Sequence, residues 1–173
     1  RVRESVLNLN ERLTGSRLLR GMVSVGGVRR DLSREQVQDL RATIGIIESE
    51  FDDLIALVKS SDSTRDRLRR TGILQPEKAA ALGVVGVAGR ASGVSLDVRR
   101  DHPYAAYDRI SFDVPVYDVG DVWHRMQVRI DEVRQSIRIV RAGLESLPDG
   151  QFCAPSTPVP EGMCAISAVE GWR

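Results

Sequence analysis

Apolar residues recur along two stretches of the chain in alternating steps of four and three, the spacing of one face of an α-helix. Between them stand mostly charged and polar residues, so one face is expected to contact protein and the other water. The later stretch has Met126, Ile130, Val133, Ile137, Val140, Leu144 and Leu147, and the earlier one has Val37, Leu40, Ile44, Ile47, Phe51, Leu54 and Val58. Two apolar faces of equal length predict two long antiparallel helices at the core of a bundle.

Shorter elements are predicted before the first of these long helices. Apolar residues at helical spacing from Val2 to Leu13 predict an opening helix that closes at about Gly21, because glycine is unfavourable within helices. The segment 23–28 predicts a short extended piece with a paired-glycine turn. Ser33 and Gln36 form a capping box, which places the start of the long helix there.

After that helix, Asp62 or Ser63 is expected to cap a short basic helix, and a second short helix is expected to begin at Pro76 and close at Gly83. The arginines between positions 65 and 70 predict a solvated face, with an anion or partner site as the alternative. The glycines between 83 and 93 lack the strand and long helix of a dinucleotide site, and they predict close packing.

Two later segments predict extended structure. Residues 110–117 alternate in polarity but contain Pro115, so we expect an edge strand or an extended arm, and residues 165–169 predict one more short strand. The expected fold is mainly α: a helical bundle with a glycine-rich irregular arm and short β-strands, as a single domain over residues 1–173.

Composition limits the possible functions. The 173 residues carry a net charge of +1, spread along the helices, so nucleic acid is not an expected partner. No apolar run approaches the roughly 18 to 20 residues that span a bilayer. The chain begins without a signal peptide or a methionine, so we expect a piece of a larger protein, cut at both ends.

Catalytic and metal-binding groups are not indicated by spacing. Cys153 and Cys164 are the only cysteines, and His102 and His124 lie far from them in sequence, so no metal site is expected. A disulfide between the two cysteines remains an alternative, although free thiols are expected in a chain without a secretory signal. No nucleophile with a base is evident, and we assign no catalytic residue.

Several motifs in sequence order resemble one known family. They are Leu13 to Arg17, Gly26 to Leu32, Arg90 to Gly93, Asp97 to Arg99, Pro103 and Tyr104, Tyr107, Phe112 to Pro115, Gly120 and Asp121, Arg125, Arg129, Glu132, Ser136, and Val169 to Arg173. Together they resemble the hydrogenase-like large subunit shared by respiratory complex I (its 49-kDa or D subunit) and by membrane-bound nickel–iron hydrogenases related to formate hydrogenlyase.

The resemblance implies the central helical domain of an oxidoreductase large subunit that passes electrons from iron–sulfur clusters to protons or quinone, inert in isolation. The two CxxC pairs that hold nickel and iron in the hydrogenases, and the quinone head-group residues of complex I, would lie outside this chain. Leu19 stands where complex I members have a histidine near the terminal cluster, which favours the hydrogenase branch. The alternative is a helical scaffold that assembles a complex without chemistry of its own.

The resemblance also suggests contact residues. Arg17 and Arg90 are candidates to face an iron–sulfur cluster, and Asp31 to face the small subunit, with an internal salt bridge as the alternative. Val6 and Leu9 are expected to be covered in the parent and to drive self-association of the chain alone. The expected partners are the small iron–sulfur subunit and membrane subunits, on the cytoplasmic face of the inner membrane. No cofactor is expected within the chain itself.

Overall fold

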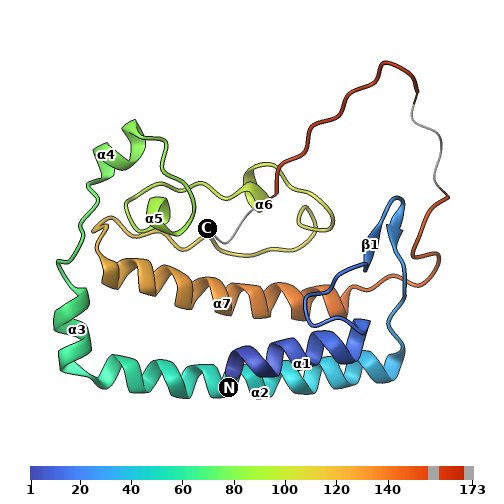
Figure 1. Ribbon diagram of the computed structural model, residues 1–173, viewed down its shortest axis with the longest axis horizontal. Coiled ribbons are helices and arrows are strands. Elements are labelled where there is room, and N and C mark those ends of the chain that lie inside the picture. Colours follow the sequence, from blue (N-terminus) through green and yellow to red (C-terminus); the bar gives the residue numbers. More distant parts are fainter. Residues whose placement is uncertain (156–159, 170–173) are drawn as a thin grey trace. The chain divides into compact units, whose positions relative to one another are not determined.

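The computed structural model describes residues 1–155 and 160–169, and it is mainly α-helical, as the sequence predicts (Figure 1). In the described part, the strands β1 (Val23–Ser24) and β2 (Gly27–Val28) form an antiparallel pair. The helices are α1 (Val2–Thr14), α2 (Arg34–Ser60), α3 (Asp62–Leu68), α4 (Pro76–Ala81), α5 (Gly86–Arg90), α6 (Val98–Asp101) and α7 (Val122–Glu145).

The structure divides into two compact units. Among the described residues, the first holds 1–53, 144–155 and 160–166, and the second holds 54–143 and 167–169. The boundaries fall inside α2 and close to the end of α7. The single domain expected over residues 1–173 and the packing of the two long helices against each other therefore stay predictions.

In the first unit, α1 and α2 run antiparallel. Arg12, near the end of α1, forms an ion pair with Asp39 at 3.2 Å, near the start of α2, whereas Arg1 pairs with Glu50 at 2.9 Å. Helix α1 ends at Thr14, before the predicted end at Gly21. The reason is Gly15, which adopts φ 75° and donates its amide to the α1 carbonyl of Glu11, an arrangement that ends a helix.

The predicted paired-glycine turn joins β1 to β2, and a distant segment packs against it. Val28 donates its amide to the carbonyl of Phe152 at 3.1 Å, and Ala154 donates to the carbonyl of Gly26 at 2.9 Å. A Cβ atom on Gly26 would lie 2.3 Å from the Ala154 carbonyl oxygen, and one on Gly27 would lie 2.3 Å from that of Phe152. The two glycines therefore allow this close backbone approach.

Capping residues fix where the next helices begin. The predicted capping box of α2 is present, since Ser33 N donates to Gln36 Oε1 at 2.9 Å and Gln36 N donates to Ser33 Oγ at 3.2 Å. Helix α3 is capped by Ser61, whose Oγ accepts the amide of Thr64, and the prediction of Asp62 or Ser63 as the cap was wrong by one or two residues. Helix α4 begins at Pro76, as predicted.

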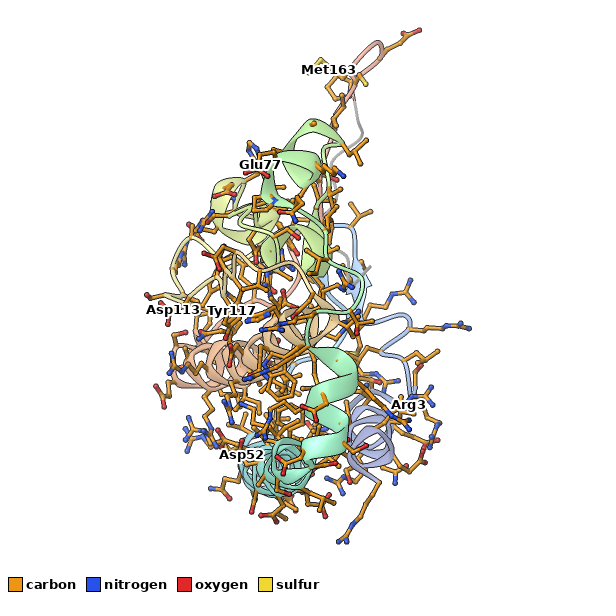
Figure 2. The ribbon with its side chains drawn as sticks, turned by 90° about the vertical axis from the view of Figure 1, so that its left-hand side faces the viewer. Arg3, Asp52, Glu77, Asp113, Tyr117 and Met163 are labelled. Carbon is orange, nitrogen blue, oxygen red and sulfur yellow. The ribbon has the colours of Figure 1, made fainter. Side chains whose placement is uncertain are left out.

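In the second unit, the segment from 111 to 117 is an extended arm that follows α7, preceded by turns over residues 105–109 (Figure 1). It forms no strand because its amides bond elsewhere: Asp113 N donates to Gln135 Oε1 of α7 at 3.1 Å, and Tyr117 N donates to the Arg90 carbonyl at 2.7 Å. Figure 2 shows Asp113 and Tyr117 near each other on this arm. Of the two options for residues 110–117, the structure has the extended arm.

The strand predicted over residues 165–169 is absent from the structure. Ile166 is 96% exposed, and no backbone hydrogen bond ties this segment to a neighbouring strand in the described part of the chain. Trp172, which belongs to the last of the motifs noted above, lies outside the described residues. Across residues 1–155 and 160–169, none of the helices combines the length and the apolar character needed to cross a bilayer.

Candidate functional site

Arg90 is the most deeply buried of the sequence-predicted site residues. Arg90 is the last residue of α5, and its side chain is 3% exposed. The preceding Gly89 packs so closely that a Cβ atom there would lie 2.5 Å from the Val84 carbonyl oxygen. The guanidinium contacts the Glu132 carboxylate on α7, donates to the Leu96 carbonyl at 2.9 Å, and lies 4.0 Å from Asp97 Oδ2. The structure thus contains the internal salt bridge that was the alternative for Arg90.

Asp97 is the second buried charge of this cluster. Its Oδ1 accepts hydrogen bonds from the backbone amide and Nε of Arg99, both at 3.0 Å, and its Oδ2 accepts one from an Arg99 terminal nitrogen at 2.6 Å. Burial raises the pKa of Asp97, but the hydrogen bonds and charge of Arg99, with the charge of Arg90, outweigh it and hold the pKa below its usual range. The carboxylate therefore stays ionised and ties α6 to α5.

The arm is held to α7 by a half-buried phenol. Tyr117 donates its hydroxyl to Asp131 Oδ2 at 2.6 Å, and its ring centroid lies 5.4 Å from that of His124. Burial, followed by this hydrogen bond to a carboxylate, raises the pKa of Tyr117 to about 12. The phenol is therefore neutral near pH 7 and acts as a hydrogen-bond donor.

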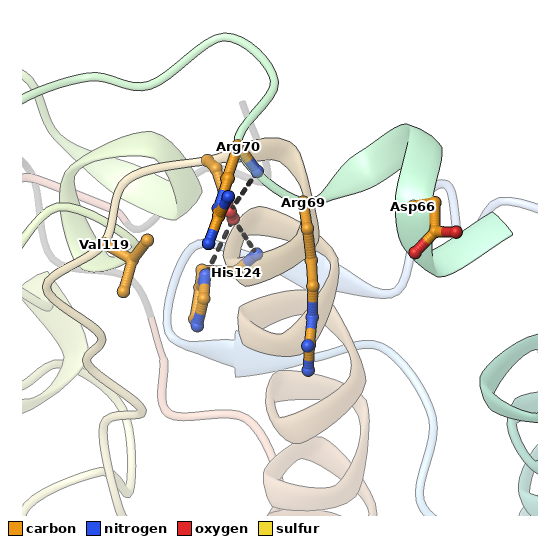
Figure 3. Close-up of a pocket in the computed structure, with 6 residues that line it drawn as sticks. Asp66, Arg69, Arg70, Val119 and His124 are labelled. Carbon is orange, nitrogen blue, oxygen red and sulfur yellow. Dashed lines mark hydrogen bonds and ion pairs between the residues drawn. The ribbon is translucent and has the colours of Figure 1, made fainter. Parts of the chain in front are cut away.

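The first turn of α7 forms one side of a cavity of about 610 Å³. Asp121 immediately precedes the helix and is buried. Its Oδ1 accepts hydrogen bonds from the backbone amide and the ring Nδ1 of His124, at 2.9 and 2.7 Å. Its Oδ2 accepts a hydrogen bond from the Arg70 amide at 2.9 Å (Figure 3). Burial raises the pKa of Asp121, but these hydrogen bonds lower it below the usual range. The lining residues are Asp66, Arg69, Arg70, Val119, Asp121 and His124.

Arg17 lies in the first unit, just after α1. Its guanidinium pairs with Glu4 at 2.7 Å and Glu11 at 3.7 Å and donates to Asn8 Oδ1 at 3.0 Å, while its side chain stays 41% exposed. The hydrogen bond to Glu4 is the main cause that raises the pKa of Arg17. Arg17 and Arg90 belong to different units, so the structure does not bring them together into one site.

The remaining candidates also lie in the first unit. Asp31 is exposed, accepts the amide of Leu32 at 2.8 Å, and lines a cavity of about 300 Å³ beside the start of α2. Val6 is 38% exposed, but Leu9 is only 5% exposed and belongs to the core of the chain. Of the two predicted self-association residues, only Val6 therefore offers an exposed apolar side chain.

Both cysteines are free thiols in the structure, as expected, and they form no disulfide with each other. The sulfur of Cys153 lies 3.8 Å from Ser24 Oγ, while Cys164 is exposed. Within residues 1–155 and 160–169, no three His, Cys, Asp or Glu side chains gather in a way that could hold a metal ion.

Sequence reasoning does not find the partners of the buried charges. The motif that contains Arg90 is recognisable, but its contact with Glu132 joins residues 42 positions apart (132 − 90), which periodicity does not predict. The cavity at the start of α7 was also missed; the arginine run at 65–70, with its alternative of an anion site, is the one signal in the sequence that points to it.

Comparison with known proteins identifies the family. Residues 1–164 match the family described as the respiratory-chain NADH dehydrogenase 49 kDa subunit. The chain therefore belongs to this family, in agreement with the resemblance drawn from its motifs.

Relatives from several bacteria support the same assignment. The chain is 39% identical over 170 residues to NADH-quinone oxidoreductase subunit 4 of Thermus thermophilus, covering 96% of the chain and 42% of that protein. It is 40% identical over 149 residues to an NADH-quinone oxidoreductase subunit of Roseiflexus sp., covering 86% and 40%, and 38% identical over 154 residues to one of Clostridium beijerinckii, covering 89% and 42%. The chain thus spans about two fifths of the length of these relatives.

Proposed function

We propose that this chain is the helical part of the large subunit of a membrane-attached oxidoreductase complex, which passes electrons from iron–sulfur clusters to quinone. The proposal rests on the match of residues 1–164 to the 49 kDa family. Quinone is proposed as the acceptor because the relatives are named NADH-quinone oxidoreductase subunits. The proposed partners are an iron–sulfur subunit and membrane subunits, with the chain bound peripherally on the cytoplasmic face of the inner membrane.

Protons are the other candidate acceptor, in a complex of the nickel–iron hydrogenase type. Leu19 favours that branch, whereas the relatives that match the chain are named as quinone oxidoreductases. A nickel–iron centre needs a set of thiolate ligands. Cys153 and Cys164 are two separate free thiols without a third ligand group among the described residues, so the centre does not fit this chain and no step is assigned to it.

Arg17 is the residue best placed to contact a cluster on a partner. Arg90 is enclosed by its own unit, whereas the half-exposed guanidinium of Arg17 keeps part of its surface available beside Glu4 and Glu11. A guanidinium near a cluster stabilises its negative charge and so tunes its potential. Asp31, exposed beside the start of α2, remains the proposed contact with the small subunit.

A scaffold function is the second candidate, and the β1–β2 hairpin favours it. Val23 of β1 and Val25 of the turn that follows are each 81% exposed, which is a large apolar exposure within one hairpin. In this alternative, the hairpin binds another subunit and the chain contributes assembly alone.

Membranes from cells with and without the intact gene test the acceptor. We expect quinone reduction by NADH to be lost in the deletion and restored by the gene, while hydrogen evolution from reduced viologen is unchanged. Loss of hydrogen evolution instead would assign the proton acceptor. Unchanged rates of both reactions would contradict the proposed function.

Two variants then separate the electron-transfer and scaffold functions. Arg17→Gln should shift the potential or the paramagnetic resonance spectrum of a neighbouring cluster in the assembled complex. Arg20→Gln removes the same charge from the same loop, where the Arg20 guanidinium forms no ion pair with the described residues, and should leave the spectrum unchanged. If Arg17→Gln leaves the cluster unchanged while Val23→Ser with Val25→Ser prevents assembly, the scaffold function is the correct one.

A further inference from the structure

The cavity at the start of α7 has a rigid backbone frame. Val122 N donates to the Thr71 carbonyl at 3.0 Å, and Arg125 donates to the carbonyls of Gly72 and Gly120 at 2.9 and 2.8 Å. Asp121 adds its bond to the Arg70 amide. Because these bonds tie the loop after α3 to the first turn of α7, the backbone that carries the side chains of that loop is held in place.

Arg70 occupies an unfavourable backbone conformation within this frame. Its φ of 59° lies in the left-handed region, which is costly for a residue with a long side chain and which glycine or asparagine adopts more readily. Its guanidinium nevertheless makes no hydrogen bond or ion pair with any residue that the structure describes. A large charged side chain at such a position, without a partner among the described residues, points to a role outside the fold.

The neighbouring side chains of Arg69 and His124 are also available to a ligand. The Arg69 guanidinium carbon lies 5.4 Å from the centroid of the Trp123 ring, and Arg69 has no ion pair with a carboxylate in the described parts of the chain. His124 uses Nδ1 for Asp121, which leaves Nε2 for a ligand. Arg70 and His124 both line this cavity at the start of α7, and Figure 3 shows Asp66 beyond Arg69.

We propose that this cavity binds a phosphate group through the guanidinium groups of Arg69 and Arg70 and Nε2 of His124. Two arginines match the charge of a phosphate better than that of a single carboxylate, and guanidinium groups bind phosphate oxygens through paired hydrogen bonds. The carboxylate of Asp121 already accepts hydrogen bonds from three N–H groups, and its bond to Nδ1 orients the His124 ring so that Nε2 is left to contact the ligand. This site is independent of the proposed electron-transfer function.

Calorimetric titration of the purified protein with inorganic phosphate, at constant ionic strength, tests the site. Arg70→Asn removes the charge and suits the left-handed backbone, so it should weaken phosphate binding at least about tenfold without lowering the melting temperature. Arg67→Gln is the matched control, because Arg67 lies on α3 outside the cavity lining. Its dissociation constant should stay within about twofold of the wild type.

Two further ligands identify the chemistry. Acetate should bind at least about tenfold more weakly than phosphate if the site needs two negative charges. Glycerol 1-phosphate carries the same group as an ester: binding tighter than inorganic phosphate assigns an esterified phosphate as ligand, and weaker binding assigns the free ion. Absence of phosphate binding by the wild type, equal losses in Arg70→Asn and Arg67→Gln, or acetate binding as tight as phosphate would overturn the proposal.

Discussion

Gly120→Ala is expected to destabilise the second unit by much more than a change of backbone preference alone. Gly120 has φ 72°, and a Cβ atom there would lie 2.0 Å from the Leu74 carbonyl oxygen and 2.9 Å from Ser92 Oγ. The left-handed conformation costs alanine roughly 1 to 2 kcal/mol. The Leu74 oxygen belongs to the backbone, so the clash is relieved only if the loop moves away from α7.

That movement breaks specific hydrogen bonds. Leu74 N donates to the Gly120 carbonyl at 3.1 Å, and Gly120 N donates to the Ala91 carbonyl at 2.7 Å. Each net hydrogen bond contributes about 0.5 to 1.5 kcal/mol to stability. Loss of both, added to the conformational cost, predicts a destabilisation of about 2 to 5 kcal/mol for Gly120→Ala.

Gly83→Ala provides the matched control. Gly83 has φ 61°, but no atom lies within 4 Å of the position of a Cβ atom, so the variant carries the conformational cost alone. Urea unfolding followed by circular dichroism should show that Gly83→Ala lowers the free energy of unfolding by about 1 to 2 kcal/mol, and that Gly120→Ala lowers it by at least about 1 kcal/mol more. Equal losses in the two variants would refute the argument from the close approach to Leu74.

Four further outcomes are expected. Ile137→Ala should lower the free energy of unfolding by about 2 to 5 kcal/mol because the Ile137 side chain is only 8% exposed. An unchanged melting temperature would contradict its burial. Asp97→Asn should lower the free energy of unfolding by about 3 to 5 kcal/mol near pH 7. Because the pKa of Asp97 is lowered in the folded state, the stability that its carboxylate contributes is present above the ordinary carboxyl pKa and is lost as the pH falls through the folded-state pKa. The difference between variant and wild type in urea unfolding should therefore shrink in acid. Elemental analysis of the purified chain should find no stoichiometric nickel, iron or zinc, and a stoichiometric metal would overturn the assignment of no metal site. Val6→Asp should reduce self-association in analytical ultracentrifugation, whereas Leu9→Asp should unfold α1 because Leu9 is buried. A wild-type chain that is monomeric at high concentration would contradict the expected self-association.

The long helices are predictable from the sequence because each carries a continuous apolar face and clear end signals. The capping box at Ser33 and Gln36 and the proline at Pro76 act through neighbouring backbone groups, so local sequence is enough to locate them. The end of α1 was misplaced because Gly15 terminates the helix by its left-handed conformation, and the sequence alone did not distinguish it from Gly21.

The site is less predictable because its contacts join distant positions. The pairing of Arg90 with Glu132, and of the Arg70 amide with Asp121, depends on how the arm and the loop after α3 meet α7. Likewise, residues 110–117 alternate like a strand, but the amides of Asp113 and Tyr117 bond to the Gln135 side chain of α7 and to the Arg90 carbonyl instead of a neighbouring strand. Motif resemblance locates Arg90, but it does not show that the guanidinium is enclosed.

The pairing of the hairpin with residues 152–154 has a consequence for the order of folding. Val25 and Cys153, which meet there, are 128 positions apart in sequence. Closing a flexible loop of that length costs on the order of 4 kcal/mol in chain entropy, far more than closing the two-residue turn between β1 and β2. The hairpin and the helices are therefore expected to form first, and the later segment to join the hairpin only once intervening structure has shortened the effective loop.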